Sequence, residues 1–98
     1  MLEQFTVETF EGRVGERFRL RLDSGEALEA ELAEATPLAP ARDGGSRAPF
    51  SLVFLGPAEP VLPQRTYTFE HGELGTFEIF VVPIGRGEAG TSYEAMFT

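Results

Sequence analysis

Residues 17–32 alternate polar and apolar side chains almost without interruption on both sides of a short turn sequence, Asp23-Ser24-Gly25. Period-two alternation is typical of strands that bury one face. A three-residue loop would place Leu22 opposite Glu26, with Gly25 in the left-handed position that such loops favour. This register pairs apolar residues on one face and opposite charges on the other: Leu20 with Leu28, Phe18 with Ala30, Arg19 with Glu29, and Arg17 with Glu31. The sequence therefore predicts an antiparallel hairpin.

The second half of this hairpin also has a high intrinsic helix propensity. Residues 26–35 are rich in Ala, Leu and Glu, and Leu28 and Leu32 are spaced as on one face of a helix. Pairing with a neighbouring strand often overrides such propensities. Because the hairpin register requires an extended chain, we predict a strand.

The N-terminal arm, residues 1–15, contains signals for a short helical turn over 5–12. Thr6 suits the N-cap, Phe5 and Phe10 occupy the hydrophobic-staple positions, and Gly12 suits the helix end. The alternative is an irregular arm that is held in place by the two phenylalanines.

Two connections separate the hairpin from the rest of the chain. Residues 36–48 contain Pro, Gly and Ser throughout and predict a long flexible loop. Residues 50–55 are apolar on both faces and predict a strand. Residues 56–64 contain three prolines, which exclude a regular ladder.

The last third of the chain predicts a three-stranded meander. Two registers place apolar residues opposite one another: Tyr67 and Phe69 facing Ile79 and Phe77 across a turn at 71–75, and Val81, Ile79 and Phe77 facing Tyr93, Ala95 and Phe97 across a loop from Pro83 to Gly90. The whole chain, 1–98, is therefore predicted as a single, mainly β domain of about six antiparallel strands. A small barrel and a compact sandwich both satisfy this pattern.

Composition limits the function classes. The sequence has 16 acidic and eight basic residues and a net charge of −8, so we expect neither nucleic acid nor a membrane surface as partner. It has no cysteine, which excludes thiolate chemistry and disulfides. Without a recognisable signal peptide or an apolar span of about 20 residues, a cytoplasmic location is the default, and incorporation into an exported or released assembly stays open.

Candidate catalytic residues are scarce. The single histidine, His71, lies beside Glu70 and Glu73 in a predicted turn, where it is either a general base oriented by a carboxylate or, as we expect, a solvated turn residue. The acids Glu29, Glu31, Glu78 and Glu94 alternate with apolar residues and predict a solvated face. We expect no enzyme activity, no cofactor and no metal site.

A second set of apolar residues shares the strand face opposite the predicted core. If Phe54 and Ile79 point inward, five residues point outward as a candidate partner interface: Val53, Leu55, Phe80, Val82 and Met96. The alternative is that the N-terminal turn or the 36–48 loop covers them. The last predicted strand is a further candidate, because a terminal strand is well placed to join another subunit's sheet.

The chain resembles a family of short bacterial all-β proteins that form a domain of unknown function. The resemblance covers nearly the whole chain, and these segments carry it: Phe10, Val14-Gly15 and Phe18; Pro49–Phe54 and Gly56-Pro57; Val61–Gln64 and Thr66-Tyr67; Glu70-His71 and Leu74-Gly75; Phe80–Gly85; and Tyr93–Phe97. It implies a genomic setting near phage-tail-collar-type proteins, and it implies no catalytic or binding residues.

These observations favour a non-catalytic structural or interaction module. We expect a homo-oligomer or a subunit of a larger, tail-like or fibre-like assembly, with a protein as its partner and the 36–48 loop as a second contact. The alternative is a small barrel that binds a hydrophobic small molecule in a cavity lined by an aromatic stripe: Phe54, Tyr67, Phe69, Ile79 and Phe97.

Overall fold

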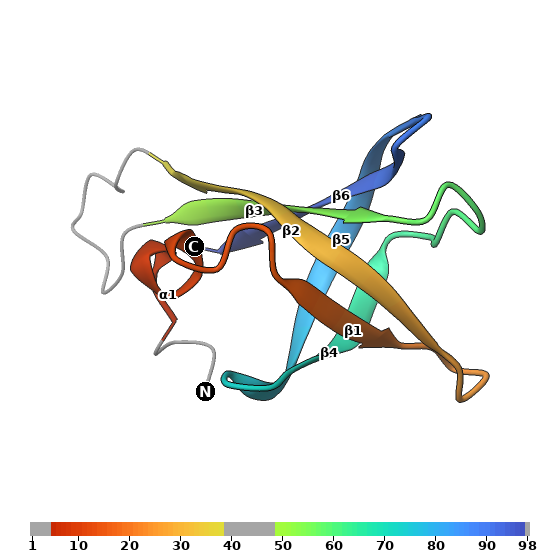
Figure 1. Cartoon of the computed structure of the whole chain (residues 1–98), viewed down its shortest axis with the longest axis horizontal. Helices are drawn as coiled ribbons and strands as arrows, with labels where there is room; N and C mark the ends of the chain where they lie inside the picture. The colour runs from red at the N-terminus through yellow and green to blue at the C-terminus, as the bar shows by residue number, and fades with distance from the viewer. Residues whose placement is uncertain (1–4, 39–48, 98) are drawn as a thin grey trace.

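Six antiparallel strands close into a barrel in the part of the chain that the structure describes, residues 5–38 and 49–97 (Figure 1). The structure is a computed structural model. In chain order the elements are α1 (Val7–Glu11), β1 (Arg17–Arg21), β2 (Ala27–Pro37), β3 (Phe50–Gly56), β4 (Arg65–His71), β5 (Gly75–Gly87) and β6 (Gly90–Phe97). The mainly β prediction is confirmed, and of the two architectures left open the chain adopts the barrel.

The β1–β2 hairpin has the predicted register at every pair, including Leu20 opposite Leu28 and Phe18 opposite Ala30. The loop closes through a hydrogen bond from the Leu22 N–H to the Glu26 carbonyl, and Gly25 has a φ of 91°. Residues 27–35 are therefore strand, as predicted, despite their helix propensity. The ion pairs run differently from the predicted direct pairs: Arg17 reaches Glu29 diagonally, at 3.2 Å.

The strand order around the barrel is β1-β2-β3-β6-β5-β4, and β4 closes the ring by pairing with β1. The terminal strand β6 therefore lies between β3 and β5, and it pairs with β3 over Thr91–Phe97. The expectation that β6 is free to join another subunit's sheet is wrong for its β3 side and, over Gly90–Glu94, for its β5 side. Internal closure uses it instead, because the barrel is complete only with β6 in place.

The β4–β5 register is as predicted, with Tyr67 opposite Ile79 and Phe69 opposite Phe77. The β5–β6 register is not: Tyr93 lies opposite Pro83 rather than Val81. The predicted loop from Pro83 is mostly strand, because β5 continues to Gly87 with an irregularity between Pro83 and Gly85. Pro83 is tolerated because it lies beyond the last β4–β5 pair, Arg65 with Val81. At this position β5 does not have to donate a backbone hydrogen bond to β4.

The first connection is shorter than predicted. Thr36 and Pro37 belong to β2 and lie opposite Ser51 and Phe50, because pairing with β3 extends the strand beyond its alternating pattern. Leu38 follows β2 and donates its N–H to the Pro49 carbonyl at 2.9 Å. The remainder of the predicted loop, 39–48, lies outside the described residues, so its suggested role as a contact stays a prediction. The Pro-rich connection runs from the end of β3 to the start of β4, as predicted.

Helix α1 closes one end of the barrel and confirms the predicted helical turn. Thr6 is the N-cap, its N–H bonds to the Thr9 hydroxyl at 3.1 Å, and Gly12 ends the helix. The Phe5 and Phe10 rings meet edge to face at 5.4 Å, which is the predicted staple contact. Phe10 is fully buried among the rings of four strands, with centroids 5.9–6.5 Å away: Phe18, Phe50, Phe77 and Phe97.

The Pro-rich connection closes the other end. Leu62 is buried, and its N–H donates to the Tyr93 hydroxyl at 2.9 Å. The Tyr67 hydroxyl donates to the Pro63 carbonyl at 2.7 Å. Burial raises the pKa of Tyr67 above its ordinary value, and the Arg65 guanidinium partly opposes this shift. Two tyrosines thus tie a segment without a ladder of its own to the barrel.

None of the described residues forms a helix of sufficient length and apolarity to cross a membrane.

Candidate functional site

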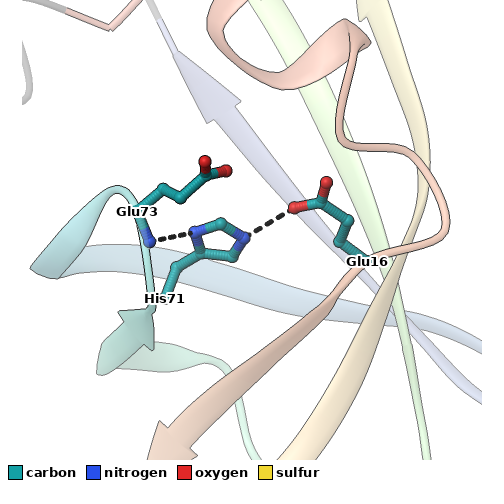
Figure 2. A group of neighbouring side chains, drawn as sticks. All are labelled: Glu16, His71 and Glu73. Atoms are coloured by element: carbon teal, nitrogen blue, oxygen red, sulfur yellow. Dashed lines mark hydrogen bonds and ion pairs between the residues drawn. The ribbon is translucent and has the colours of Figure 1, made fainter.

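His71 is the last residue of β4, and its ring organises the turn that leads into β5 (Figure 2). Its Nδ1 accepts the backbone N–H groups of Glu73 at 3.1 Å and Leu74 at 3.2 Å. Its Nε2 lies 2.7 Å from a carboxylate oxygen of Glu16, which directly precedes β1. The ring also packs 4.5 Å from that of Phe18. Only 7% of the side chain is exposed, so the expectation of a solvated turn residue is wrong.

These contacts determine the tautomer of His71. A nitrogen that accepts hydrogen bonds carries no hydrogen, so the neutral ring has its hydrogen on Nε2 and donates it to Glu16. The general-base alternative required a carboxylate that orients the ring. The carboxylate hydrogen-bonded to the ring belongs to Glu16 and not to the sequence neighbours Glu70 or Glu73. Both ring nitrogens serve internal hydrogen bonds, which makes His71 a link between the β4–β5 turn and the start of β1.

Glu16, His71 and Glu73 form a group whose ligand atoms lie within 4.8 Å of one another. A metal at Nε2 would require a lone pair there, but the hydrogen bonds to Nδ1 place the hydrogen on Nε2. The Glu73 carboxylate is, in addition, 3.4 Å from the Arg13 guanidinium, a cation that repels a metal ion. These residues do not fit a metal ion.

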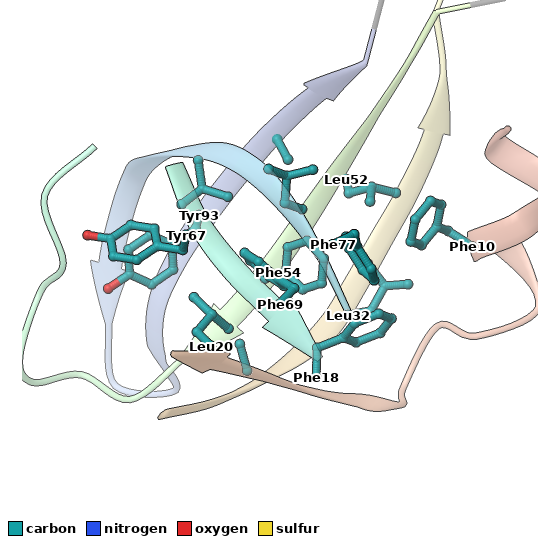
Figure 3. Close-up of a cluster of buried hydrophobic side chains, with 14 of the residues drawn as sticks. Phe10, Phe18, Leu20, Leu32, Leu52, Phe54, Tyr67, Phe69, Phe77 and Tyr93 are labelled. Carbon is teal, nitrogen blue, oxygen red and sulfur yellow. The ribbon is translucent and has the colours of Figure 1, made fainter. Parts of the chain in front are cut away.

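The barrel interior is filled by its own side chains (Figure 3). The aromatic stripe that would line a ligand cavity is buried, at most 6% exposed in any member. Its rings contact one another and their neighbours, as in the 4.9 Å separation of Phe54 from Phe69 and the 4.5 Å stacking of Phe50 on Phe97. At these distances the residues of the stripe pack against other side chains. No cavity is described beside them, and binding of a hydrophobic ligand stays a prediction.

The five candidate interface residues lie on three adjacent strands and point away from the core. Phe80 on β5 and Met96 on β6 are 51% and 58% exposed. Val53 and Leu55 on β3, and Val82 on β5, are half-buried. The described residues of the N-terminal turn pack at the end of the barrel, so they leave Phe80 and Met96 exposed.

An acid interrupts this apolar set. Because β6 lies between β3 and β5, one outward row across the sheet reads Glu34, Val53, Glu94, Val82. The opposite flank of the barrel carries β1, whose Arg17 and Arg21 are paired with Glu29 and Glu70. Within the described chain, no ion pair is recorded for four acids of the β2-β3-β6-β5 face: Glu31, Glu34, Glu78 and Glu94. The alternating pattern of the sequence identified Glu31, Glu78 and Glu94 as outward acids, but it indicated neither Glu34 nor the strand order that places these acids beside the valines.

Two shallow surface pockets of about 360 Å³ each lie over the β1–β2 hairpin. One extends from Arg17 and Arg19 to His71, and the other from Arg17 to Leu55 and Ala89. Both are bordered by the Arg17–Glu29 ion pair, so their charges are largely compensated.

The sequence of residues 5–97 matches a family model described as a domain of unknown function, DUF6916. The chain belongs to this family. The match covers the whole barrel with α1, and it confirms the resemblance to an uncharacterised family. Neither the curated proteins nor the solved structures include a match to the chain.

Proposed function

We propose that the chain is a non-catalytic interaction module that works as a subunit of a larger or self-assembling protein structure. The observation that carries this proposal is the outward apolar set on β3, β5 and β6, with Phe80 and Met96 about half exposed. Large apolar side chains that remain exposed on adjacent strands are typical of protein interaction sites. The filled interior also supports a role for the outer surface.

The biological setting of the proposal comes from the resemblance to bacterial proteins encoded near phage-tail-collar-type proteins. We propose synthesis in the cytoplasm of a bacterium and incorporation into a tail-like or fibre-like assembly. The partner is a protein or further copies of the chain rather than nucleic acid or membrane, because the net charge of −8 repels both.

Light scattering coupled to size exclusion, over a wide concentration range and with negative-stain images of the largest species, tests self-assembly. If copies of the chain assemble with one another, we expect rings, tubes or filaments that Phe80→Asp abolishes while the circular dichroism spectrum of the fold is retained. Val14→Asp is the matched control, because Val14 is 50% exposed but precedes β1, outside the candidate interface.

A monomer of 10.7 kDa at every concentration would contradict self-assembly and leave a different protein as partner. If Phe80→Asp unfolds the protein, Phe80 contributes to the core and the interface loses its main support.

A further inference from the structure

Strand β5 changes its pairing partner half-way along its length. Gly75–Val81 pairs with β4, and Val82–Gly87 pairs with β6. The recorded β5–β6 pairs begin at Val82 opposite Glu94, so the first half of β5 has a ladder on one side only. Figure 1 shows β5 and β6 side by side near the turn that joins them and diverging towards the end of the barrel that carries α1.

No described segment pairs with the other side of Gly75–Val81. The backbone hydrogen bonds of the described turns and loops lie elsewhere: at α1, between residues 15–16 and Leu32, at the β1–β2 turn and at the first connection. The N-terminal turn contacts this half of β5 through aromatic side chains, as in the 5.2 Å separation of the Phe5 and Phe77 ring centroids. Alternate residues of a strand direct N–H and C=O to each side. Gly75–Val81 therefore presents backbone groups that an extended chain could pair with.

The side chains beside this edge show which chain would fit. Glu78 and Phe80 point outward from β5, and Glu94 and Met96 point outward from the neighbouring strand. No ion pair is recorded for either glutamate within the described ranges. Apolar side chains would pack on Phe80 and Met96, and basic ones would neutralise the two acids.

We propose that the Gly75–Val81 edge of β5 binds an extended segment of another protein, in which basic and apolar residues alternate, by strand addition. This inference rests on the proposed function and specifies its partner. A different protein is favoured over a second copy because each copy carries a net charge of −8, which opposes self-association at this acidic face. Backbone hydrogen bonds would supply general affinity, and the acids and Phe80 would select the side chains.

The first experiment measures amide hydrogen exchange by NMR on the isolated monomeric protein. We expect fast exchange for about half of the amides in Gly75–Val81, those directed away from β4, and slow exchange for the amides of Phe50–Gly56, a strand paired on both sides. Slow exchange throughout Gly75–Val81 in the monomer would show that the edge is already occupied, and it would overturn the proposal.

The second experiment adds a synthetic heptapeptide of alternating Arg and Val with blocked ends. We expect it to protect the fast-exchanging amides of β5. A peptide of the same sequence with alternate backbone nitrogens methylated is the control, because it keeps every charge but loses the donors that strand addition uses. Equal binding of both peptides, or binding of neither, would overturn strand addition by a basic segment.

Glu78→Gln tests the chemistry of recognition. We expect it to weaken peptide binding about two- to fivefold, the range for one exposed ion pair. Glu88→Gln is the matched control, because it removes the same charge at the β5–β6 turn. Equal effects of the two variants would show that only overall charge matters and would overturn the assignment to this edge.

Protection of β5 that appears only as the concentration of the protein alone is raised would identify a second copy as the occupant. That outcome would overturn the basic partner but support the proposed self-assembly.

Discussion

At the residue scale, Gly90 is required for its lack of a side chain. It opens β6 with a φ of 138°, a conformation that other residues rarely adopt, and a Cβ built there would overlap the carbonyl oxygen of Gly56 on β3. Because this oxygen belongs to the backbone, a clash is relieved only by separating two paired strands.

We expect Gly90→Ala to lower the free energy of unfolding by about 2–4 kcal/mol, through backbone strain and overlap together. Urea unfolding measures this, with Gly87→Ala as the control, because a Cβ at Gly87 meets open space. Equal stability of the two variants would show that β3 and β6 separate without cost.

His71 combines two roles in one ring: acceptor for the β4–β5 turn and donor to Glu16. We expect His71→Asn to destabilise the protein by about 1 kcal/mol less than His71→Ala, because an amide oxygen can replace Nδ1 as the turn acceptor. Thermal and urea unfolding compare the variants. Nitrogen-15 NMR of the wild-type ring should show a hydrogen on Nε2, and a neutral ring with its hydrogen on Nδ1 would contradict the assignment.

At the scale of elements, the main role of α1 is to close one end of the barrel with the buried side chain of Phe10. Five residues are too few for an independent helix, so its stability comes from its cap and from Phe10. The cap signals are local in sequence and were therefore predictable. The packing of Phe10 inside the barrel was not predictable, because the four strand rings that it contacts come from β1, β3, β5 and β6.

We expect Phe10→Ala to cost about 3–5 kcal/mol, the range for removing a buried aromatic ring. Loss of α1 should also raise the hydrogen exchange of the Gly15 amide, which bonds to the Leu32 carbonyl just beyond the helix. Val14→Ala serves as the control because Val14 is half exposed. A cost below about 1 kcal/mol for Phe10→Ala would mean that this end of the barrel is stable without the Phe10 side chain.

At the scale of the whole molecule, closure depends on a short β1–β4 ladder: Arg19 opposite Glu70, Leu20 opposite Phe69 and Arg21 opposite Thr68. Leu20 also lies opposite Leu28, so one buried side chain packs across both neighbours of β1. Its contacts therefore join the first hairpin to the C-terminal half of the barrel.

We expect Leu20→Ala to cost about 2–5 kcal/mol and to leave unfolding two-state, with an unchanged urea m-value. Unfolding remains two-state because the β1–β4 ladder and the core form and break together. Unfolding curves that differ between near-ultraviolet and far-ultraviolet circular dichroism would instead indicate that the barrel opens before it unfolds. Ile84→Ala is the control because Ile84 is exposed.

The sequence by itself determined the local features: the β1–β2 and β4–β5 registers, the cap and staple of α1, and the outward direction of Phe80 and Met96. Each depends on residues close in the chain, where alternation and turn chemistry act directly. Only the tertiary structure decided the strand order, the β5–β6 register and the partner of His71. Barrel closure joins segments that are distant in the chain, and the local pattern of one segment does not specify which other segment it pairs with. Glu16 and His71 are 55 positions apart, and only the β1–β4 pairing brings them together.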